Sequence, residues 1–242
     1  MSATGRGGVY LERAAYYTPL PLARFLLGLL PVWDRPRRVL EPHAGSGSFL
    51  TAALELESKG GVFHRLYALD IDPTAKGVEL ARAEGGWGAV GCFLSTPLPA
   101  RPDVIIGNPP YSEVQAEVRC ERCEGSGRRP PHGETALDCK RCKGAGWYTP
   151  KPVAVAHLHI RRALKVVAPG GHVAFLLRLG IVEGRDRFPL FRDHPPRKVF
   201  ALSSRPSFVG GSSDQTSYGF FHWQQGYQGP TEFEVVDWNP AE

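Results

Sequence analysis

Short apolar runs and longer amphipathic stretches alternate along most of the chain. The apolar runs, which have the length and composition of buried strands, lie at residues 38–41, 66–70, 89–94, 103–106, 173–177, 198–202 and 218–223. Apolar residues recur at helical spacing over residues 20–30, 48–56, 74–83 and 153–167. Strands that alternate with helices pair in parallel, because each helix returns the chain to the same edge of the sheet. The pattern predicts an α/β fold with a mostly parallel sheet.

The periodicity is interrupted between residues 113 and 150, where Gly, Pro and Cys are frequent. We expect a small inserted unit there, so that residues 16–112 and 151–242 form the two halves of one α/β domain. Residues 1–15 begin with a small, polar, Gly-rich stretch that is typical of a flexible terminus. A chain of 242 residues is long enough for one such domain plus an insertion.

The apolar run at 103–106 leads into a polar and rigid turn, Asn108-Pro109-Pro110-Tyr111. In open α/β sheets, ligands bind where the parallel strands end. The prolines have no N–H and a fixed φ, so the backbone after Asn108 is stiff and its carbonyl groups are free to accept hydrogen bonds. An amide oxygen, a backbone carbonyl and an aromatic ring together suit a planar group that carries an NH2. The alternative is an ordinary surface turn, for which Asn-Pro and Pro-Pro are common.

This turn resembles the Asn-Pro-Pro-Tyr motif of the amino methyltransferases that use S-adenosylmethionine, and the chain is most similar to the N6-adenine DNA methyltransferases. The resemblance runs from Tyr16 to Trp223, apart from the insertion, and includes the compact enzymes of phages and mobile elements. It implies a Rossmann-like class I methyltransferase fold, with a mostly parallel seven-stranded sheet and helices on both faces. It also implies that residues 108–111 form the catalytic turn.

A cofactor-binding loop is expected after the first strand, where Glu41-Pro42 leads into Gly45-Ser46-Gly47. The two glycines allow the backbone to approach a ligand closely, and the helix that follows offers unpaired N–H groups. Asp70, at the end of the second strand, would accept hydrogen bonds from both hydroxyls of a ribose. Asp72 is expected to be the N-cap of the helix at 74–83.

The resemblance implies further cofactor contacts. In the family, a Thr-Pro pair at the position of Thr18-Pro19 lines the cofactor pocket, although such a pair is more often an ordinary helix N-cap. The set of cofactor-binding residues that it implies is Tyr17, Thr18, Glu41, Pro42, Gly45, Gly47, Phe49, Asp70, Ile71, Phe93 and Asn108. One position departs from the family pattern, because Cys92 replaces the usual Asp that accepts from the adenine amino group. A thiol is a weak acceptor, so that contact is missing or Ser95 supplies it.

The insertion contains the pattern Cys-x-x-Cys-x-Gly-x-Gly twice, at residues 120–127 and 139–146. Two thiolates at this spacing can bind one ion, and the glycines allow a tight knuckle whose N–H groups point at sulfur. Four thiolates leave no open coordination position, so we expect a structural Zn2+ at Cys120, Cys123, Cys139 and Cys142. The halves also resemble, locally, the zinc-binding repeats of J-domain cochaperones.

The role of this knuckle pair has two interpretations. It either closes a long loop, or it lies over the catalytic turn and contacts nucleic acid. The second interpretation is slightly favoured and uses the basic residues of the insertion, which are Arg119, Arg122, Arg128, Arg129, Lys140, Arg141 and Lys143.

The net charge of +5 is unevenly distributed, because residues 151–205 carry 11 basic and 3 acidic side chains. Such an excess suits a face that contacts phosphate, or simply solvated helix faces. The acidic segment 231–242 is expected to stay away from phosphate. The chain contains no apolar run of membrane-spanning length and no basic-then-apolar leader, so we expect a cytoplasmic protein with no membrane partner. Paired cysteines favour a metal site in a reducing compartment over disulfides.

The function implied by the resemblance is methyl transfer from S-adenosylmethionine to N6 of adenine in DNA, on a base flipped out of the stack. The side-chain oxygen of Asn108 and the carbonyl of Pro109 would hold the amine, while Tyr111 and Phe208 would bind the base. A separate target-recognition domain is absent, so site specificity stays open. His157 and His159 are expected to be surface or capping residues.

Two alternatives stay open. The first is amino methylation of RNA or of a protein glutamine, although the glutamine enzymes carry a helical domain before the cofactor loop and only forty residues precede Glu41 here. The second is a catalytically silent nucleic-acid-binding protein, which Cys92 supports. No obligate protein partner is evident.

Overall fold

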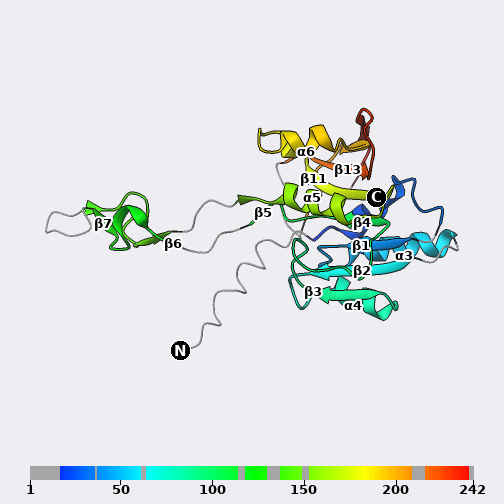
Figure 1. The fold of residues 1–242 in the computed structure, drawn as a ribbon, viewed down its shortest axis with the longest axis horizontal. Helices are drawn as coiled ribbons and strands as arrows, with labels where there is room; N and C mark the ends of the chain where they lie inside the picture. Colours follow the sequence, from blue (N-terminus) through cyan, green and yellow to red (C-terminus); the bar gives the residue numbers. More distant parts are fainter. Residues whose placement is uncertain are drawn as a thin grey trace. The chain divides into compact units, whose positions relative to one another are not determined.

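The computed structural model describes residues 17–35, 37–60, 64–113, 118–129, 137–148, 153–208 and 216–239. The chain divides into two compact units, one built from Met1–Tyr111 with Val155–Glu242 and the other from Ser112–Ala154. We refer to them as the α/β unit and the cysteine unit (Figure 1). Residues 1–15, for which a flexible terminus is expected, lie outside the described residues.

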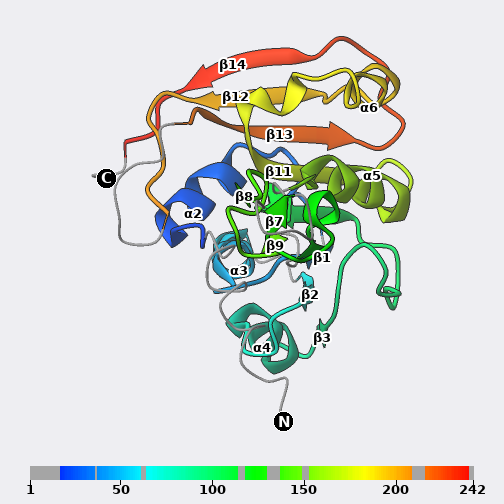
Figure 2. The ribbon, with the colours of Figure 1, turned by 90° about the vertical axis from the view of Figure 1, so that its left-hand side faces the viewer.

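The α/β unit is built on one eight-stranded sheet with the strand order β14-β12-β13-β11-β4-β1-β2-β3 (Figure 2). In chain order, the strands are β1 (Arg38–Glu41), β2 (Arg65–Asp70), β3 (Trp87–Val90), β4 (Val104–Gly107), β11 (His172–Arg178), β12 (Lys198–Leu202), β13 (Tyr218–Gln224) and β14 (Glu232–Val236). The helices are α2 (Leu20–Gly28), α3 (Ser48–Gly60), α4 (Lys76–Ala83), α5 (Ala156–Val166) and α6 (Phe188–Asp193), with a 3-10 turn η2 at Leu179–Val182.

Parallel pairing joins β3, β2, β1, β4 and β11, whereas β13 runs antiparallel to both β11 and β12. Strand β2 lies on one side of β1 and β4 lies on the other, so the winding direction reverses between β1 and β4. In open α/β sheets, this reversal opens a crevice beyond the carboxyl ends of the two strands. The loops after β1 and β4 therefore meet at the position where a ligand is expected.

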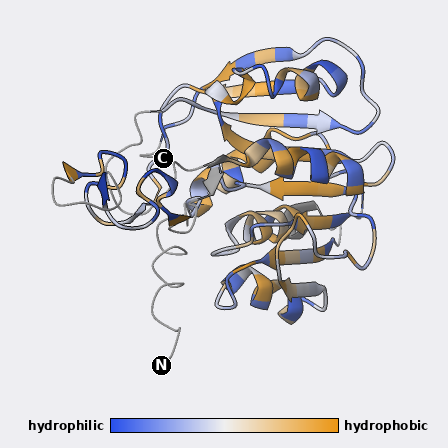
Figure 3. Cartoon of the chain, turned by 60° about the vertical axis from the view of Figure 1, so that its left-hand side comes forward, coloured by the Kyte–Doolittle hydropathy of each residue, from blue (hydrophilic) through white to orange (hydrophobic). Residues whose placement is uncertain are grey.

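The sheet is covered on both faces. Helices α2, α3 and α4 pack on one face, and α5 and α6 pack on the other (Figure 2). Strand β4 shows how the sequence specifies this arrangement: Val104 and Ile106 face the first layer, while Ile105 faces the second. All three are 0% exposed, and burying each such side chain contributes about 1.5–3 kcal/mol. Apolar residues accordingly run along the central strands (Figure 3).

The predicted fold class is confirmed, but the sheet has eight strands instead of seven. The additional strand is β14, which pairs in parallel with β12 at the edge of the sheet. Its side chains Phe233 and Val235 are 64% and 66% exposed, so the strand lacks the buried apolar face by which a strand is recognised in a sequence.

Several element boundaries also differ from the predictions. The third strand ends at Val90 instead of residue 94, and the helix expected over 74–83 begins at Lys76. Asp72 does not cap that helix, because its Oδ1 accepts hydrogen bonds from the N–H and the hydroxyl of Thr74 at 2.8 and 2.7 Å, which forms a local turn. The helix expected over 153–167 begins at Ala156.

The described residues of the cysteine unit form three small antiparallel sheets. They pair β5 (Ser112–Glu113) with β10 (Val153–Ala154), β6 (Val118–Arg119) with β9 (Trp147–Tyr148), and β7 (Arg128–Arg129) with β8 (Leu137–Asp138). A 3-10 turn η1 spans Glu121–Cys123. Among the helices in the described part of the chain, none combines the length and the apolarity needed to cross a bilayer.

Candidate functional site

The loops after β1 and β2 are tied together by the carboxylate of Asp70. Its Oδ2 accepts a hydrogen bond from the N–H of Gly45 at 2.8 Å, and its Oδ1 accepts one from the N–H of Asp72 at 2.9 Å. Burial is the largest influence on this carboxyl and raises its pKa. A carboxylate oxygen has more than one lone pair, so Asp70 retains acceptor capacity for the two hydroxyls of a ribose.

The loop after β1 requires glycine at positions 45 and 47. Gly45 and Gly47 have φ values of +39° and +79°, in the region that side chains rarely adopt. A Cβ atom at Gly45 would lie 2.8 Å from Cε1 of Tyr17, and one at Gly47 would lie 2.9 Å from Cα of Gly77. The loop is therefore packed closely between the segment before α2 and the start of α4.

Tyr17, Thr18 and Ile71 lie on the segments that border this loop. Thr18 is 6% exposed, and its Oγ1 has no hydrogen-bond partner in the described part of the chain. Helix α2 has Pro19 as its N-cap and no side-chain cap, so Thr18 does not serve as the ordinary cap. A buried hydroxyl without a partner costs stability unless a ligand or water pairs with it. Ile71 follows Asp70 and is 58% exposed, so an apolar surface is available next to the carboxylate.

Glu41 stabilises the loop after β1. The residue is 4% exposed, and one carboxyl oxygen accepts a hydrogen bond from the N–H of Leu50, in the first turn of α3, at 3.3 Å. Burial raises the pKa of this carboxyl well above its usual range. Glu41 therefore holds the start of α3 against the end of β1, and Pro42 beside it is buried. Its hydrogen bond is with the protein backbone, and its contact with a cofactor stays a prediction.

Two of the expected cofactor-binding aromatic rings lie in the core. Phe49 is 1% exposed and stacks on Phe220, with ring centroids 6.4 Å apart and planes at 9°. Phe93 is 2% exposed and packs against His43 and His159. Both rings are thus packed inside the α/β unit, and their contact with a cofactor stays a prediction.

The turn Asn108-Pro109-Pro110-Tyr111 follows β4 directly. The hydroxyl of Tyr111 donates to Oδ1 of Asn108 and lies 3.4 Å from the carbonyl oxygen of Leu176. Pro109 is buried, and its carbonyl receives no hydrogen bond within the described residues. Pro110 is partly buried. The amide oxygen of Asn108 and the carbonyl of Pro109 are therefore the acceptors that the turn offers.

An aromatic and cationic cluster surrounds Tyr111. Its ring lies 5.9 Å from that of Tyr218, and the guanidinium carbon of Arg178 lies over it at 5.0 Å from the centroid. Phe208 is 7% exposed and meets Tyr218 edge-on at 5.1 Å. Sequence reasoning missed Tyr218 and Arg178, because both read as residues of ordinary strands; stacking of a base by Phe208 stays a prediction.

Two histidines meet beneath the loop after β1. Nε2 of His43 lies 2.8 Å from Nδ1 of His159, and His159 is 6% exposed. The expectation that His159 is a surface or capping residue is therefore wrong, because α5 turns this residue towards the sheet. Burial is the main cause of the lowered pKa values of both rings, which reaches about 4 for His159.

Cys92 is exposed in the loop after β3. Its carbonyl oxygen accepts hydrogen bonds from the N–H groups of Ser95 and Thr96 at 3.1 and 2.8 Å. The Ser95 hydroxyl also points to this carbonyl, at 3.5 Å. The loop thus lacks a carboxylate at the position where the family pattern has one.

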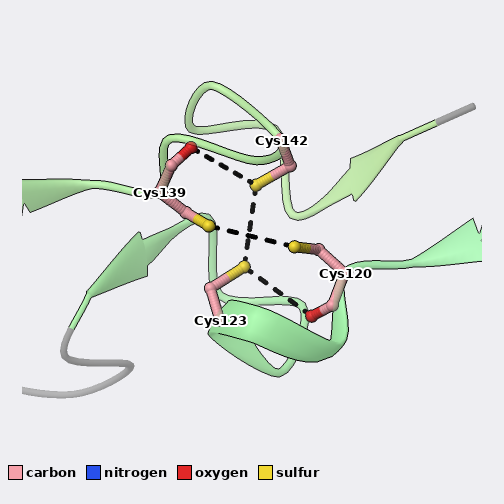
Figure 4. A group of neighbouring side chains, drawn as sticks. All are labelled: Cys120, Cys123, Cys139 and Cys142. Carbon is pink, nitrogen blue, oxygen red and sulfur yellow. Dashed lines mark hydrogen bonds between the residues drawn. The ribbon is translucent and has the colours of Figure 1, made fainter.

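The four cysteines of the cysteine unit converge on one point (Figure 4). Their sulfur atoms lie within 4.8 Å of one another, with 3.9 Å between Cys120 and Cys139 and 3.6 Å between Cys123 and Cys142. Zinc–sulfur bonds of about 2.3 Å in a tetrahedron require sulfur atoms about 3.8 Å apart. All four residues are buried and none forms a disulfide. This set of thiols fits a closed tetrahedral site for a metal ion.

Solved structures share this architecture. A methyltransferase subunit of the type I restriction-modification system of Streptococcus thermophilus aligns with 98% of this chain and 53% of its own, at a TM-score of 0.61 and 16% identity. A protein assigned to the class I S-adenosylmethionine-dependent methyltransferases of Listeria monocytogenes aligns with 91% of this chain and 65% of its own, at 0.59 and 17%. The chain has the class I methyltransferase fold.

Two curated relatives match part of this methyltransferase fold in sequence. They are the type II methyltransferase M.XamI of Xanthomonas campestris pv. amaranthicola, 34% identical over 105 residues, and M.TthHB8I of Thermus thermophilus, 38% identical over 101 residues. Each match covers 40% of this chain but only 19% and 21% of the respective relative. The matched stretch is thus about a fifth of the length of these relatives. No family model matches the chain.

Proposed function

We propose that this chain transfers a methyl group from S-adenosylmethionine to the N6 amino group of adenine in DNA. The observation that carries the proposal is the pair of acceptors at the end of β4, the amide oxygen of Asn108 and the carbonyl of Pro109, at the reversal point of the sheet. The partial similarity to two type II methyltransferases supports this choice of chemistry.

The residues at the crevice suit the cofactor. Asp70 would accept from the ribose hydroxyls, the backbone at Gly45 and Gly47 would allow close approach, and Oγ1 of Thr18 is a buried polar atom that still needs a partner. Tyr17 and Ile71 border the same place, and both are exposed. S-adenosylmethionine supplies an electrophilic methyl group on a sulfonium centre.

The turn would activate the amine by positioning it. The N6 atom cannot be reached inside a duplex, so the adenine has to be flipped out of the stack. The nitrogen lone pair is delocalised into the ring, and two acceptors on its protons favour a pyramidal nitrogen whose lone pair can be aimed. Asn108 and Pro109 also stabilise the positive charge that develops on nitrogen, without a covalent intermediate.

Tyr111 would orient the amide of Asn108. Its hydroxyl donates to Oδ1, and this hydrogen bond uses one of the two lone pairs that an amide oxygen carries. The guanidinium of Arg178 over the Tyr111 ring stabilises this ring position by a cation–π contact. Tyr111 therefore acts on the reaction through Asn108 as well as through its ring.

The cysteine unit is proposed to bind Zn2+ as a structural ion. The sulfur spacing supports this, and so do the N–H groups of Gly127 and Gly146, which lie 3.3 Å from the sulfurs of Cys123 and Cys142. Such N–H groups stabilise thiolates.

The decisive variant is Asn108→Ala. We expect methyl transfer to fall by about 100-fold or more, because one of the two acceptors is lost, while the affinity for S-adenosylmethionine stays within about twofold. The measurement is incorporation of a labelled methyl group into duplex DNA, with calorimetry of cofactor binding.

Asp70→Ala is the matched control, because it should weaken cofactor binding and leave the turn intact. Methyl transfer by Asn108→Ala at the normal rate would refute the assignment. Parallel assays on structured RNA and on protein test the other amino substrates, and DNA binding without cofactor binding would favour a catalytically silent protein.

A further inference from the structure

The two knuckles of the cysteine unit are structurally equivalent. The N–H of Cys120 donates to the carbonyl of Gly146 at 2.8 Å, and the N–H of Cys139 donates to the carbonyl of Gly127 at 2.7 Å. The residue after each second cysteine is left-handed in both knuckles, with φ of 50° at Glu124 and 53° at Lys143. Each knuckle also directs a glycine N–H at its second sulfur. The backbone of the two knuckles therefore imposes the same conformational requirements on equivalent positions.

Their charges, however, are opposite. The first knuckle carries Glu121, Arg122 and Glu124, and the equivalent positions of the second carry Lys140, Arg141 and Lys143. All six residues are exposed. Because the backbone geometry is the same, folding of the knuckles does not require this reversal. The difference in charge therefore indicates a binding partner of the second knuckle.

Aromatic rings adjoin the positive knuckle. Trp147 in β9 is 52% exposed, and the guanidinium carbon of Arg141 lies 4.4 Å from the ring centroid of Tyr148. No ion pair joins Lys140, Arg141 or Lys143 to a carboxylate within the described part of the chain, although the carboxylate of Asp138 lies beside Gly144. Cations without carboxylate partners can bind phosphate, and an exposed indole next to them can stack on a base. The surface therefore matches the two contacts that nucleic acids offer.

We propose that this surface, defined by Lys140, Arg141, Lys143, Trp147 and Tyr148 and called here the basic knuckle, binds the phosphate backbone of DNA. Trp147 stacks on an unpaired base of the same strand. The inference rests on the proposed function in that the bound DNA is the substrate of methyl transfer, and it gives the chain a substrate contact outside the α/β unit. The contact with nucleic acid is thereby assigned to the second knuckle, and not to all seven basic residues of the insertion.

The test exchanges the charges of the two equivalent knuckles. The swap variant Glu121→Lys/Glu124→Lys/Lys140→Glu/Lys143→Glu keeps the net charge and reverses the polarity of the unit. Zinc-loaded full-length chain is titrated into labelled duplex and single-stranded DNA without cofactor, at several salt concentrations. We expect the swap variant to lose affinity by about tenfold or more and its log–log salt slope to become shallower by about two.

The control variant Glu121→Lys/Glu124→Lys changes the first knuckle only and should keep at least normal affinity. Trp147→Ala should weaken binding of single-stranded DNA by about tenfold, because stacking on one base is lost. The zinc content of each variant verifies folding. If the swap variant loses its zinc, the pair Lys140→Gln/Lys143→Gln replaces it and should still make the salt slope shallower by about two.

The inference is overturned if the swap variant binds DNA like the unchanged protein, since affinity would then come from net charge or from the α/β unit. The inference is also overturned if the basic knuckle binds an unfolded apolar peptide and does not bind DNA. Loss of DNA affinity in the swap variant, together with no methyl transfer by the unchanged protein, would leave this inference standing and remove the proposed function.

Discussion

At the scale of single residues, the proposed site contains two acceptors that hydrogen bonds hold in place, and it lacks one acceptor that the resemblance implies. Asp70 is held by two backbone N–H groups, and Oδ1 of Asn108 is held by the Tyr111 hydroxyl. Cys92 is different, because it is exposed at the position where the resemblance implies a carboxylate acceptor for the adenine amino group. The proposed cofactor site would therefore lack one charged hydrogen bond to the adenine amino group.

Cys92→Asp is expected to tighten binding of S-adenosylmethionine. A hydrogen bond to a charged acceptor contributes about 1.5–3 kcal/mol, so a gain of about tenfold or more in affinity is expected by calorimetry. Cys92→Ser is the control, because a hydroxyl adds no charge and should change affinity little. If Cys92→Asp binds no more tightly than the unchanged protein, another group already contacts that amine.

At the scale of elements, the knuckles depend on glycines as much as on cysteines. A Cβ at Gly127 would lie 2.1 Å from the carbonyl oxygen of Gly144, and one at Gly146 would lie 2.3 Å from that of Gly125. The two halves therefore touch through their backbones. Among the described residues of the unit, the buried cluster consists of the four cysteines, with Tyr148 packed against it. We therefore expect a bound metal ion to be the main source of stability for this unit.

Zinc removal is expected to unfold the cysteine unit and to spare the sheet of the α/β unit. After treatment with a strong chelator, amide hydrogen exchange should become fast across residues 118–129 and 137–148 and stay slow in β1, β4 and β11, since the described core around these strands contains no cysteine of the cluster. Re-addition of Zn2+ should restore protection. Unchanged exchange in these two segments after complete removal of the metal would contradict a structural role for the ion.

At the scale of the whole molecule, stability should depend on keeping buried histidines neutral. The pKa values of His159 and His222 are lowered to about 4 and about 3, in both cases mainly by burial. Each has a histidine neighbour, because His159 pairs with His43 and Nε2 of His222 lies 3.0 Å from Nδ1 of His172. The unfolded chain takes up protons below about pH 6.5, whereas the folded chain does so only near the lowered values.

Acid should therefore destabilise the protein over a defined range. The contribution of each buried histidine is fully present above pH 6.5 and is lost as the pH falls from 6.5 towards the folded pKa, with about 2 kcal/mol lost per buried histidine between pH 7 and pH 5. Urea titrations of the metal-loaded protein at these two pH values measure the difference. His222→Gln should reduce the loss by its own share, and equal unfolding free energies at pH 7 and pH 5 would show that the histidines do not set the acid limit.

The sequence alone determined the α/β class, the place of the Asn108-Pro109-Pro110-Tyr111 turn after a buried strand, and the four clustered cysteines. These features depend on local spacing: short apolar runs and helical repeats show which segments are buried, and Cys-x-x-Cys brings two sulfurs together within one turn. Only the tertiary structure decided which distant residues meet. His43 and His159 are separated by 116 positions, and Tyr111 meets Tyr218 from another strand. Neither pair has a local signal, because packing of one element on another, and not the repeat within either, sets the contact.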